Sequence, residues 1–386
     1  MSNSEPKDQA GISHDPAATD TTDTPSHAHD NEKKDDRPRD SKGWDGKLRL
    51  SKKDLSGDIA GLNIESDPEV SEDELEGPPP EQLPADEDLL DDVGEDEDEI
   101  DLVHMRVADM GSLRLERFGK LQRLCLRQNQ ITSVELPESL APTLTEIDLY
   151  DNLISHIKGF DAFTELVSLD LSFNKIKHIK RLNHLMKLKD LYFVQNKIST
   201  IEGLDGLSNL RQLELGANRV RSIENLETLT GLEELWLGKN KITEIKGLDT
   251  LSNLKILSIQ SNRLTAITGL EKLANLEELH ISHNALTEIS GLDSNRKLRV
   301  IDVSANPIEH LTGLSQLKHL EELWASNCKL GSFAEVEKEL RDKEELQTVY
   351  FEGNPLQTNQ RALYRNKVKL ALPQIVQIDA TFVKTV

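Results

Sequence analysis

A pattern of leucine, isoleucine and asparagine recurs every 22 residues through most of this chain. One copy spans residues 229–250, with the sequence LTGLEELWLGKNKITEIKGLDT, and the same pattern returns at 251–272 and at 207–228. A fixed period of this length indicates a solenoid, because each unit cannot bury its apolar face alone and must pack against its neighbours. The repeat therefore limits the possible folds more strongly than the composition does.

An asparagine marks the same point of each copy. It recurs at intervals of 23 and then 22 residues, at Asn129, Asn152, Asn174, Asn196, Asn218, Asn240, Asn262, Asn284 and Asn306. The next position in this series holds Cys328, and Asn354 closes the series after an insertion. Leu102, Met105 and Val107 indicate a degenerate first repeat, as expected where a solenoid must close an open end.

The motif L-x-x-L-x-L-x-x-N at this period is that of the leucine-rich repeat, and it predicts about eleven to twelve repeats over residues 101–361. In Leu235-Trp236-Leu237 the apolar residues alternate with period two, which is typical of a strand with one buried face. The bulkier return path bends the stack of strands. We therefore expect an α/β fold, a leucine-rich-repeat solenoid with a curved parallel sheet of about eleven strands on the concave face and short helices or 3-10 turns on the convex face.

Two polar details of the repeat fit this path of the chain. The asparagine lies in the turn after the strand, where its amide can bond backbone groups that would otherwise be buried without a partner. Glycine is common seven residues after the asparagine and permits a turn on the return path, at Gly159, Gly203, Gly247, Gly269, Gly291 and Gly313. The sequence EVEKELRDKEEL at residues 335–346 predicts one short helix within the insertion, on the convex side.

Two segments flank the repeats. Residues 1–100 contain 31 Asp and Glu against 10 Lys and Arg, whereas the remaining residues are nearly neutral. Because this segment has few apolar residues, we expect a disordered acidic leader, either an interaction tail or a solubilising extension. Residues 362–386 predict a C-terminal cap that consists of a short helix, then Leu372-Pro373, then an apolar strand.

The sequence also argues against several classes of protein. No run of about 18 apolar residues occurs, and the N-terminus lacks a basic start and an apolar stretch, so we expect neither a membrane partner nor secretion. Cys125 and Cys328 lie about nine repeats apart, too far for a disulfide within one chain, and free thiols favour the nucleus and cytoplasm. An acidic segment repels nucleic acid. No metal-ligand cluster, phosphate loop or dinucleotide motif is present, so we expect no metal or cofactor.

The residue between the two strand leucines must point away from the core, because its neighbours point inward. This position is never Lys or Arg, and it reads Cys125, Asp148, Asp170, Tyr192, Glu214, Trp236, Ser258, His280, Asp302, Trp324 and Tyr350. The outward position two residues earlier has one base, Arg123, and the acids Glu146, Asp190, Glu234, Glu278 and Glu322. Exposed aromatics favour contact with a protein partner, although they can also pack together to stabilise neighbouring strands. We expect an acidic concave face that binds a folded protein with a basic, partly apolar surface.

Ser258, His280 and Asp302 occupy this position on three successive strands, in the order of a catalytic triad. Their strands would be spaced ~4.8 Å apart. A triad also needs an oxyanion hole and a pocket that excludes water, and an open sheet supplies neither. No G-x-S-x-G turn surrounds Ser258. We therefore expect no enzyme activity and interpret His280 as a contact residue for a partner.

Several segments resemble a known family. The 22-residue repeats, the segments LRQN, LYFVQNKIS, LELGANRVRSIENL, LWLGKNKITEI and IQSNRLT, and the ending YRNKVKLALPQIVQIDATFV resemble the leucine-rich-repeat regulatory subunits of protein phosphatase type 1, over about residues 102–386. The resemblance implies a non-catalytic subunit that binds the phosphatase catalytic subunit through the concave face. It also implies control of that subunit's maturation, activity or location, with a role in mitotic exit and chromosome segregation.

The resemblance further implies which residues contact the partner. By position they are Asp148, Asp170, Tyr192, Glu214, Trp236, Asp302, Glu322, Trp324 and Tyr350. His280 joins them from its place in the same row. No short basic-Val/Ile-x-Phe/Trp docking motif occurs, so the concave face itself must hold the partner. Two expectations stay open: a third protein in the same complex, and an alternative function as a leucine-rich-repeat adaptor of another intracellular complex.

Overall fold

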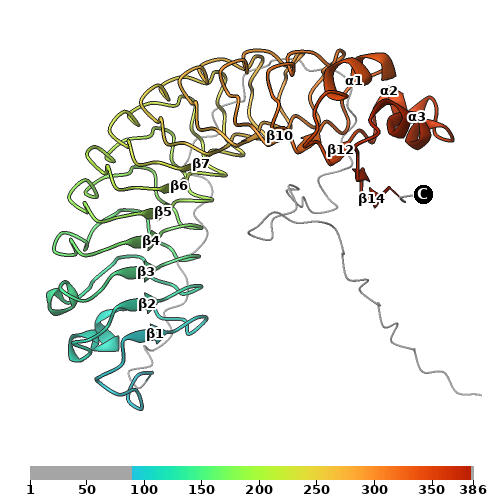
Figure 1. Cartoon of the computed structure of the whole chain (residues 1–386). Helices are drawn as coiled ribbons and strands as arrows, with labels where there is room; N and C mark the ends of the chain where they lie inside the picture. The colour runs from blue at the N-terminus through green and yellow to red at the C-terminus, as the bar shows by residue number, and fades with distance from the viewer. Residues whose placement is uncertain (1–88, 384–386) are drawn as a thin grey trace, which may run out of the picture. The chain divides into compact units, whose positions relative to one another are not determined.

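The structure is a computed structural model that describes residues 89–383 (Figure 1). Expectations for residues 1–88 lie outside the described residues. Residues 89–100 belong to the predicted leader, but part of this stretch is folded. Leu90 is buried, and Glu99–Asp101 form strand β1 with Ile100 in the core. Strand β1 thus lies across the predicted boundary at residue 100. Acids dominate this stretch, but a strand that alternates them with one apolar residue keeps its charges in water.

Within the described residues, fourteen strands form one sheet in chain order. Eleven of them recur once per repeat, as β2 (Arg123–Cys125), β3 (Glu146–Asp148), β4 (Ser168–Asp170), β5 (Asp190–Tyr192), β6 (Gln212–Glu214), β7 (Glu234–Trp236), β8 (Ile256–Ser258), β9 (Glu278–His280), β10 (Val300–Asp302), β11 (Glu322–Trp324) and β12 (Thr348–Tyr350). β1 precedes them, and a hairpin of β13 (Gln377–Ile378) and β14 (Thr381–Phe382) follows. β14 runs antiparallel to β13, whereas β1 to β13 are parallel. The sheet of eleven predicted strands thus continues past both of its ends, with β1 before β2 and with β13 and β14 after β12.

The strands lie along the inner side of the arc in Figure 1, and the return segments lie along its outer side. The predicted leucine-rich-repeat solenoid with a concave parallel sheet is confirmed. In the described residues the return segments are mostly turns, because helices this short gain little stability by themselves. The exceptions are three 3-10 segments and three α-helices: η3 (Gly111–Leu113), η4 (Leu115–Arg117), η5 (Glu138–Leu140), α1 (Phe333–Leu340), α2 (Pro355–Thr358) and α3 (Tyr364–Ala371).

The predicted role of the repeat asparagine is confirmed and extends to the neighbouring repeat. Asn240 Nδ2 donates at 2.8, 3.0 and 3.4 Å to the backbone oxygens of Leu215, Leu237 and Gly238. Its Oδ1 accepts from the Val220 amide at 2.9 Å. Each asparagine thus closes its own turn and ties it to the preceding repeat, so the series forms a hydrogen-bonded seam along the solenoid.

Cys328 interrupts this seam. Its thiol donates weakly to the backbone oxygens of Val303 and Ser326, at 3.4 and 3.7 Å. The Ile308 amide, which would otherwise meet an asparagine Oδ1, bonds the backbone oxygen of Asn306 at 2.8 Å. Burial raises the pKa of Cys328 to about 11, so this thiol stays protonated near neutral pH.

The degenerate first repeat is present and lacks the seam residue. Leu102 and Val107 are buried, whereas Met105 occupies the asparagine position and is 47% exposed. The Val107 amide donates to Oδ1 of Asn129 in the second repeat, at 3.0 Å. The second repeat therefore satisfies part of the backbone of the first, which needs no asparagine of its own for that bond.

The glycine column brings the backbones of neighbouring repeats into contact. Gly159 has a φ of +85°, and a Cβ there would lie 2.4 Å from the Val134 backbone oxygen. Gly206 has the same φ, but a Cβ there would meet nothing within 4 Å. The close approach recurs at Gly203, Gly247, Gly269, Gly291 and Gly313. The predicted permissive turn is confirmed, and glycine is required there for a second reason, the close backbone contact.

We expect Gly159→Ala to lower the free energy of unfolding by about 3 kcal/mol, because backbone strain and a steric clash add together. Gly206→Ala carries the same strain without the clash and should cost about 1 kcal/mol. Urea unfolding followed by circular dichroism measures both losses. Equal losses in the two variants would show that the contact between repeats contributes nothing.

The insertion after β11 forms α1 on the outer side of the arc, close to the cap (Figure 1). Ser332 begins the helix, since its hydroxyl accepts from the Glu335 amide at 3.2 Å. The helix predicted at 335–346 thus starts and ends earlier, at Phe333 and Leu340. The remaining predicted helical residues form the turn that brings buried Leu346 into the core ahead of β12.

A lysine takes a core position after α1. Lys343 is fully buried, and its Nζ lies 3.6 Å from Asp342 Oδ1, without a hydrogen-bond partner among the described residues. Burial lowers the pKa of Lys343. In four of the five preceding repeats the equivalent position is leucine, at Leu229, Leu251, Leu273 and Leu317, whereas before β10 it is the buried Asn295. The lysine therefore places a poorly solvated charge where the repeat calls for an apolar side chain.

Lys343→Met should raise the free energy of unfolding by about 1 to 2 kcal/mol at pH 7, because it removes the cost of dehydrating the ammonium. The whole cost applies at pH values below the lowered pKa of Lys343 in the folded protein, because both the folded and the unfolded chain then hold the proton. It fades as the pH rises towards about 10.4, where the unfolded chain also loses the proton. Thermal melts of both proteins at pH 7 and pH 10 test this, and an equal gain at both values would contradict a charged Lys343.

The C-terminal residues close the last repeat. Asp379 follows β13, and its Oδ1 accepts from the backbone amides of Phe351 and Glu352, at 2.8 and 3.0 Å. Tyr364 on α3 donates to Asp379 Oδ2 at 2.9 Å. Burial raises the pKa values of both side chains. Asp379 therefore supplies acceptors to amides at the end of the repeat array.

Among residues 89–383, every helix is too short or too polar to span a membrane.

Candidate protein-binding face

The first and third residues of each strand point away from the core, so the concave face carries rows of side chains. In β7, Leu235 is fully buried, whereas Glu234 and Trp236 are half-buried. The first residues of β2 to β12 are termed the first row, and the third residues the second row. Every residue predicted to contact a partner falls in these rows, Glu322 in the first and the others in the second.

A glutamate of the first row fixes each tryptophan of the second. Trp236 Nε1 donates to Glu234 Oε2 at 3.3 Å, and Trp324 Nε1 donates to Glu322 Oε2 at 2.8 Å. Both indoles are half-buried. Burial raises the pKa of Glu322, and the bond from the indole opposes this shift. An indole that is already oriented loses less conformational entropy when a partner covers it.

Aromatic rings gather at the C-terminal end of the second row. The ring of Trp324 lies 6.1 Å from that of His280 and 5.8 Å from that of Tyr350, the latter edge to face at 67°. Gln377 Nε2 donates to the Tyr350 hydroxyl at 2.9 Å. These ring contacts stabilise neighbouring strands, which is the structural role that the sequence left open. They also hold a broad, half-buried apolar surface in a fixed position.

Three residues of the second row are buried, contrary to the expectation of an open row. Ser258, His280 and Asp302 are 0%, 3% and 2% exposed. The Ser258 hydroxyl donates to Gln260 Oε1 at 2.5 Å, and His280 Nε2 bonds Glu278 Oε2 at 3.2 Å. The Ser258 hydroxyl is thus directed to Gln260 and not to His280, the partner that a catalytic triad requires. His280 and Asp302 therefore offer little free surface here.

Aspartates of the second row also bond the backbone. One Oδ1 atom in each accepts from the amide two residues further on, at 3.0, 2.8 and 2.9 Å, for Asp148, Asp170 and Asp302. Burial raises the pKa of Asp170. Such a bond closes the turn that follows the strand. An acid at this position therefore has a structural role as well. The sequence analysis, which treated the row as a contact surface, did not predict that role.

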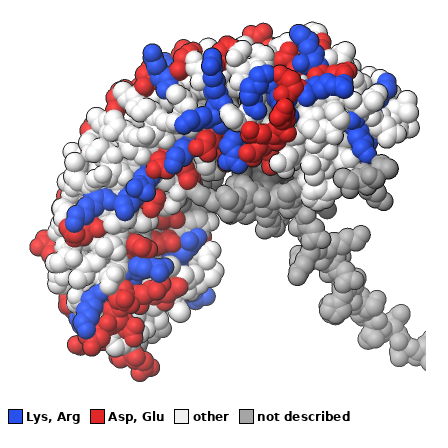
Figure 2. Space-filling view, viewed as in Figure 1, with Lys and Arg blue, Asp and Glu red and all other residues white. Residues whose placement is uncertain are grey.

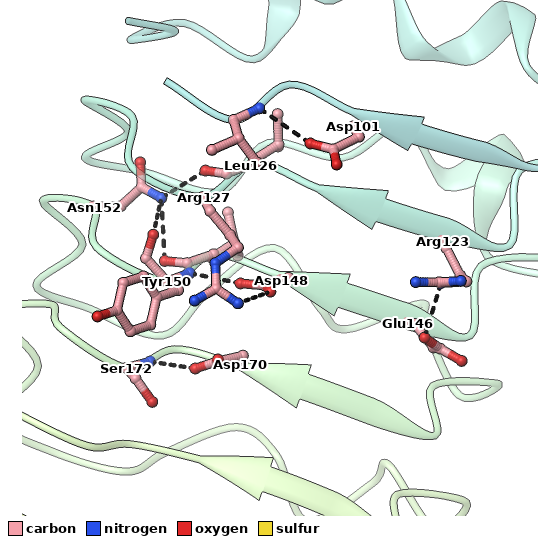
Figure 3. A network of polar contacts seen from close by, with 12 residues as sticks. Asp101, Arg123, Leu126, Arg127, Glu146, Asp148, Tyr150, Asn152, Asp170 and Ser172 are labelled. Atoms are coloured by element: carbon pink, nitrogen blue, oxygen red, sulfur yellow. Dashed lines mark hydrogen bonds and ion pairs between the residues drawn. The ribbon is translucent and has the colours of Figure 1, made fainter. Parts of the chain in front are cut away.

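A third row lies two residues beyond the second, and the sequence interpretation missed it. Arg127 Nη1 bonds Asp148 Oδ2 at 3.0 Å, and its guanidinium lies 4.2 Å from the ring centroid of Tyr150 (Figure 3). The ring of Phe173 lies 4.7 Å from that of Tyr150. The signal was present in the sequence, because the outward alternation continues for one more step before the asparagine.

Acidic and polar side chains continue across the middle of the face. Tyr192 on β5 and Glu214 on β6 are direct partners in the sheet, and both are half-buried. Gln212 Nε2 donates to Glu214 Oε1 at 2.6 Å. Burial and nearby carboxylates raise the pKa of Tyr192.

On the side of the solenoid shown in Figure 2, acids gather at the end that carries β1. No group of three or more His, Cys, Asp or Glu suited to a metal ion occurs among residues 89–383.

Comparison with known proteins agrees with the repeat pattern. A model of leucine-rich repeats in two copies matches residues 187–228 and 230–272, and a second leucine-rich-repeat model matches residues 252–308. The protein phosphatase 1 regulatory subunit SDS22 of Schizosaccharomyces pombe is 61% identical over 310 residues, which cover 80% of this chain and 92% of that protein. The chain belongs to the SDS22 family.

Other SDS22-family proteins match over shorter segments. SDS22 of Saccharomyces cerevisiae is 46% identical over 28% of this chain and 32% of its own length. Among solved structures, an internalin of Listeria monocytogenes has a TM-score of 0.62 at 21% identity, covering 75% of this chain and 82% of that chain. The internalin shows the fold alone. Because the relatives are named regulatory subunits, this SDS22-family chain is a non-catalytic repeat protein.

Proposed function

We propose that this protein regulates protein phosphatase 1 by binding its catalytic subunit on the concave face. The observation that carries the proposal is a 61% identity to a protein named as a regulatory subunit of that phosphatase. The match covers 92% of that protein's length. Control would act on the activity, maturation or location of the catalytic subunit.

The concave face has the chemistry that such binding requires. Trp236 and Trp324 are large, half-buried and held by glutamates, and Tyr350 extends the aromatic surface. Aromatic anchors of this kind supply most of the energy of a protein interface, whereas surrounding acids guide a basic partner into register. The acids and aromatics of the first two rows therefore support a partner with a basic, partly apolar surface.

The cellular role in this proposal follows from the family resemblance. We propose that the complex acts in mitotic exit and chromosome segregation and that a third protein can join it. The proposed location in the nucleus and cytoplasm rests on the free thiols and the N-terminal sequence. Depletion of the protein should then delay chromosome segregation, and a variant without the concave aromatics should fail to restore timing. Restored timing by that variant would separate the cellular role from the concave face.

Rapid mixing of the purified full-length chain with the catalytic subunit tests the proposal. We expect the association rate to fall by at least tenfold between about 50 and 500 mM salt, with a smaller change in the dissociation rate, because exposed charges mainly guide encounter. A salt-independent association rate would contradict an acidic docking face. Absence of binding, with another complex recovered from cells, would favour the adaptor function instead.

A further inference from the structure

Two columns of charged side chains follow the solenoid, and they differ in the order of their signs. The residue directly before each of the strands β6 to β11 alternates in sign, as Arg211, Glu233, Lys255, Glu277, Arg299 and Glu321. These residues pair across repeats. Lys255 Nζ lies 2.7 Å from Glu233 Oε2, and Arg299 Nε lies 2.8 Å from Glu321 Oε1. Opposite charges on neighbouring strands stabilise each other, so this column neutralises itself.

The residue directly after the asparagine has one sign in five successive repeats, as Lys175, Lys197, Arg219, Lys241 and Arg263. In the same five repeats, the residues one position before and three positions after the asparagine include Lys177, Arg221 and Lys239. They include no Asp or Glu. These eight residues are termed the basic strip. The same loops of the adjoining repeats, DNLIS at 151–155 and HNALT at 283–287, contain neither Lys nor Arg, so the strip has defined ends.

The solenoid holds the five loops of the strip side by side. The amides of the five central bases each donate to a backbone oxygen of the preceding repeat, at 2.8 or 2.9 Å. The side chains of these five bases are exposed, except that of Lys241, which is half-buried. The loops follow the strand spacing of ~4.8 Å, so the five charges extend over about 19 Å.

The charges of the strip cannot neutralise one another, because all have the same sign. Like charges at this spacing repel, and an acidic ligand turns that repulsion into attraction. An extended polypeptide rises about 3.3 Å per residue, so about six residues match the length of the strip. We propose that the basic strip binds an extended, acid-rich segment of a partner protein.

The chemistry of the strip favours a polypeptide over a single-stranded nucleic acid. Nucleic-acid channels of this kind add a row of aromatic side chains on which successive bases stack. In the five loops the one aromatic residue, Phe173, lies at the end of the strip and packs against Tyr150. The strip follows the strands and does not include the concave rows, so its ligand is distinct from the partner proposed above. The inference does not depend on that proposed function.

Fluorescence anisotropy with the full-length chain tests this inference. The probe is a labelled peptide of about twelve residues that alternates glutamate and serine, titrated at about 50 and 200 mM salt. The test variant carries Lys197→Glu, Arg219→Glu and Lys241→Glu. The control carries Lys158→Glu, Lys180→Glu and Lys272→Glu, which change the net charge equally on exposed residues outside the strip. We expect at least about tenfold weaker binding for the test variant and less than about twofold for the control.

Equal losses in the two variants would overturn the inference, because net charge alone would then explain binding. Tighter strip-dependent binding of a single-stranded uridine oligonucleotide than of the peptide would overturn it as well. Thermal melts check that each variant folds. Should the glutamate variant unfold, the glutamine version at the same three positions removes the charges without adding repulsion and should show the same selective loss.

Discussion

Replacing Asn240 with alanine should lower the free energy of unfolding by about 4 kcal/mol, the largest stability loss that we expect from a single substitution in the middle repeats. The side chain makes three donated bonds and one accepted bond with buried backbone groups of two repeats. A methyl group satisfies none of them. Urea unfolding followed by circular dichroism measures the loss.

Cys328→Ala is the matched control, since it truncates the same position of a later repeat. The thiol donates two weak bonds, and the Ile308 amide of the preceding turn already bonds the backbone oxygen of Asn306. Its truncation should therefore cost about 1 kcal/mol. A loss at Asn240 no greater than that at Cys328 would show that the amide seam is not what joins the repeats.

Trp324→Ala should weaken binding of the phosphatase catalytic subunit by about 30-fold or more, which corresponds to about 2 kcal/mol. The indole is half-buried, held by Glu322 and in contact with the rings of His280 and Tyr350. A partner that covers it therefore gains a large, pre-oriented apolar surface. Titration calorimetry with the purified catalytic subunit measures the change.

Two controls separate this effect from misfolding. Thermal unfolding of Trp324→Ala should shift little, since its ring contacts contribute about 1 kcal/mol. Met186→Ala removes a side chain that is 48% exposed and lies outside the concave rows, and it should leave the affinity unchanged. An unaltered affinity in the tryptophan variant would remove the concave aromatics from the binding mechanism.

The repeat fold could be predicted in detail because its information is local and repeated. The strand leucines, the asparagine seam and the glycine turns each depend on residues at fixed offsets, and all three occur where expected. Departures came where the repeat changes, at β1, at α1 and at Lys343. There the chain meets a boundary or an insertion, and packing against a unique neighbour decides the outcome.

The candidate binding face was predicted less completely. Alternation placed Trp236 and Trp324 on the concave side, but it could not show that Glu234 and Glu322 would hold their indoles. It also treated every position of the second row as equally open. His280 and Asp302 are nevertheless buried, because exposure depends on the sizes and bonds of the side chains around each position.

The sequence by itself determined the period, the direction in which each strand residue points and the family to which the chain is similar, because these follow from spacing along the chain. The tertiary structure decided which outward residues remain accessible and which charges face one another across repeats. Those properties arise between residues about 22 positions apart that stacking brings to strand spacing, ~4.8 Å, and no single repeat contains them.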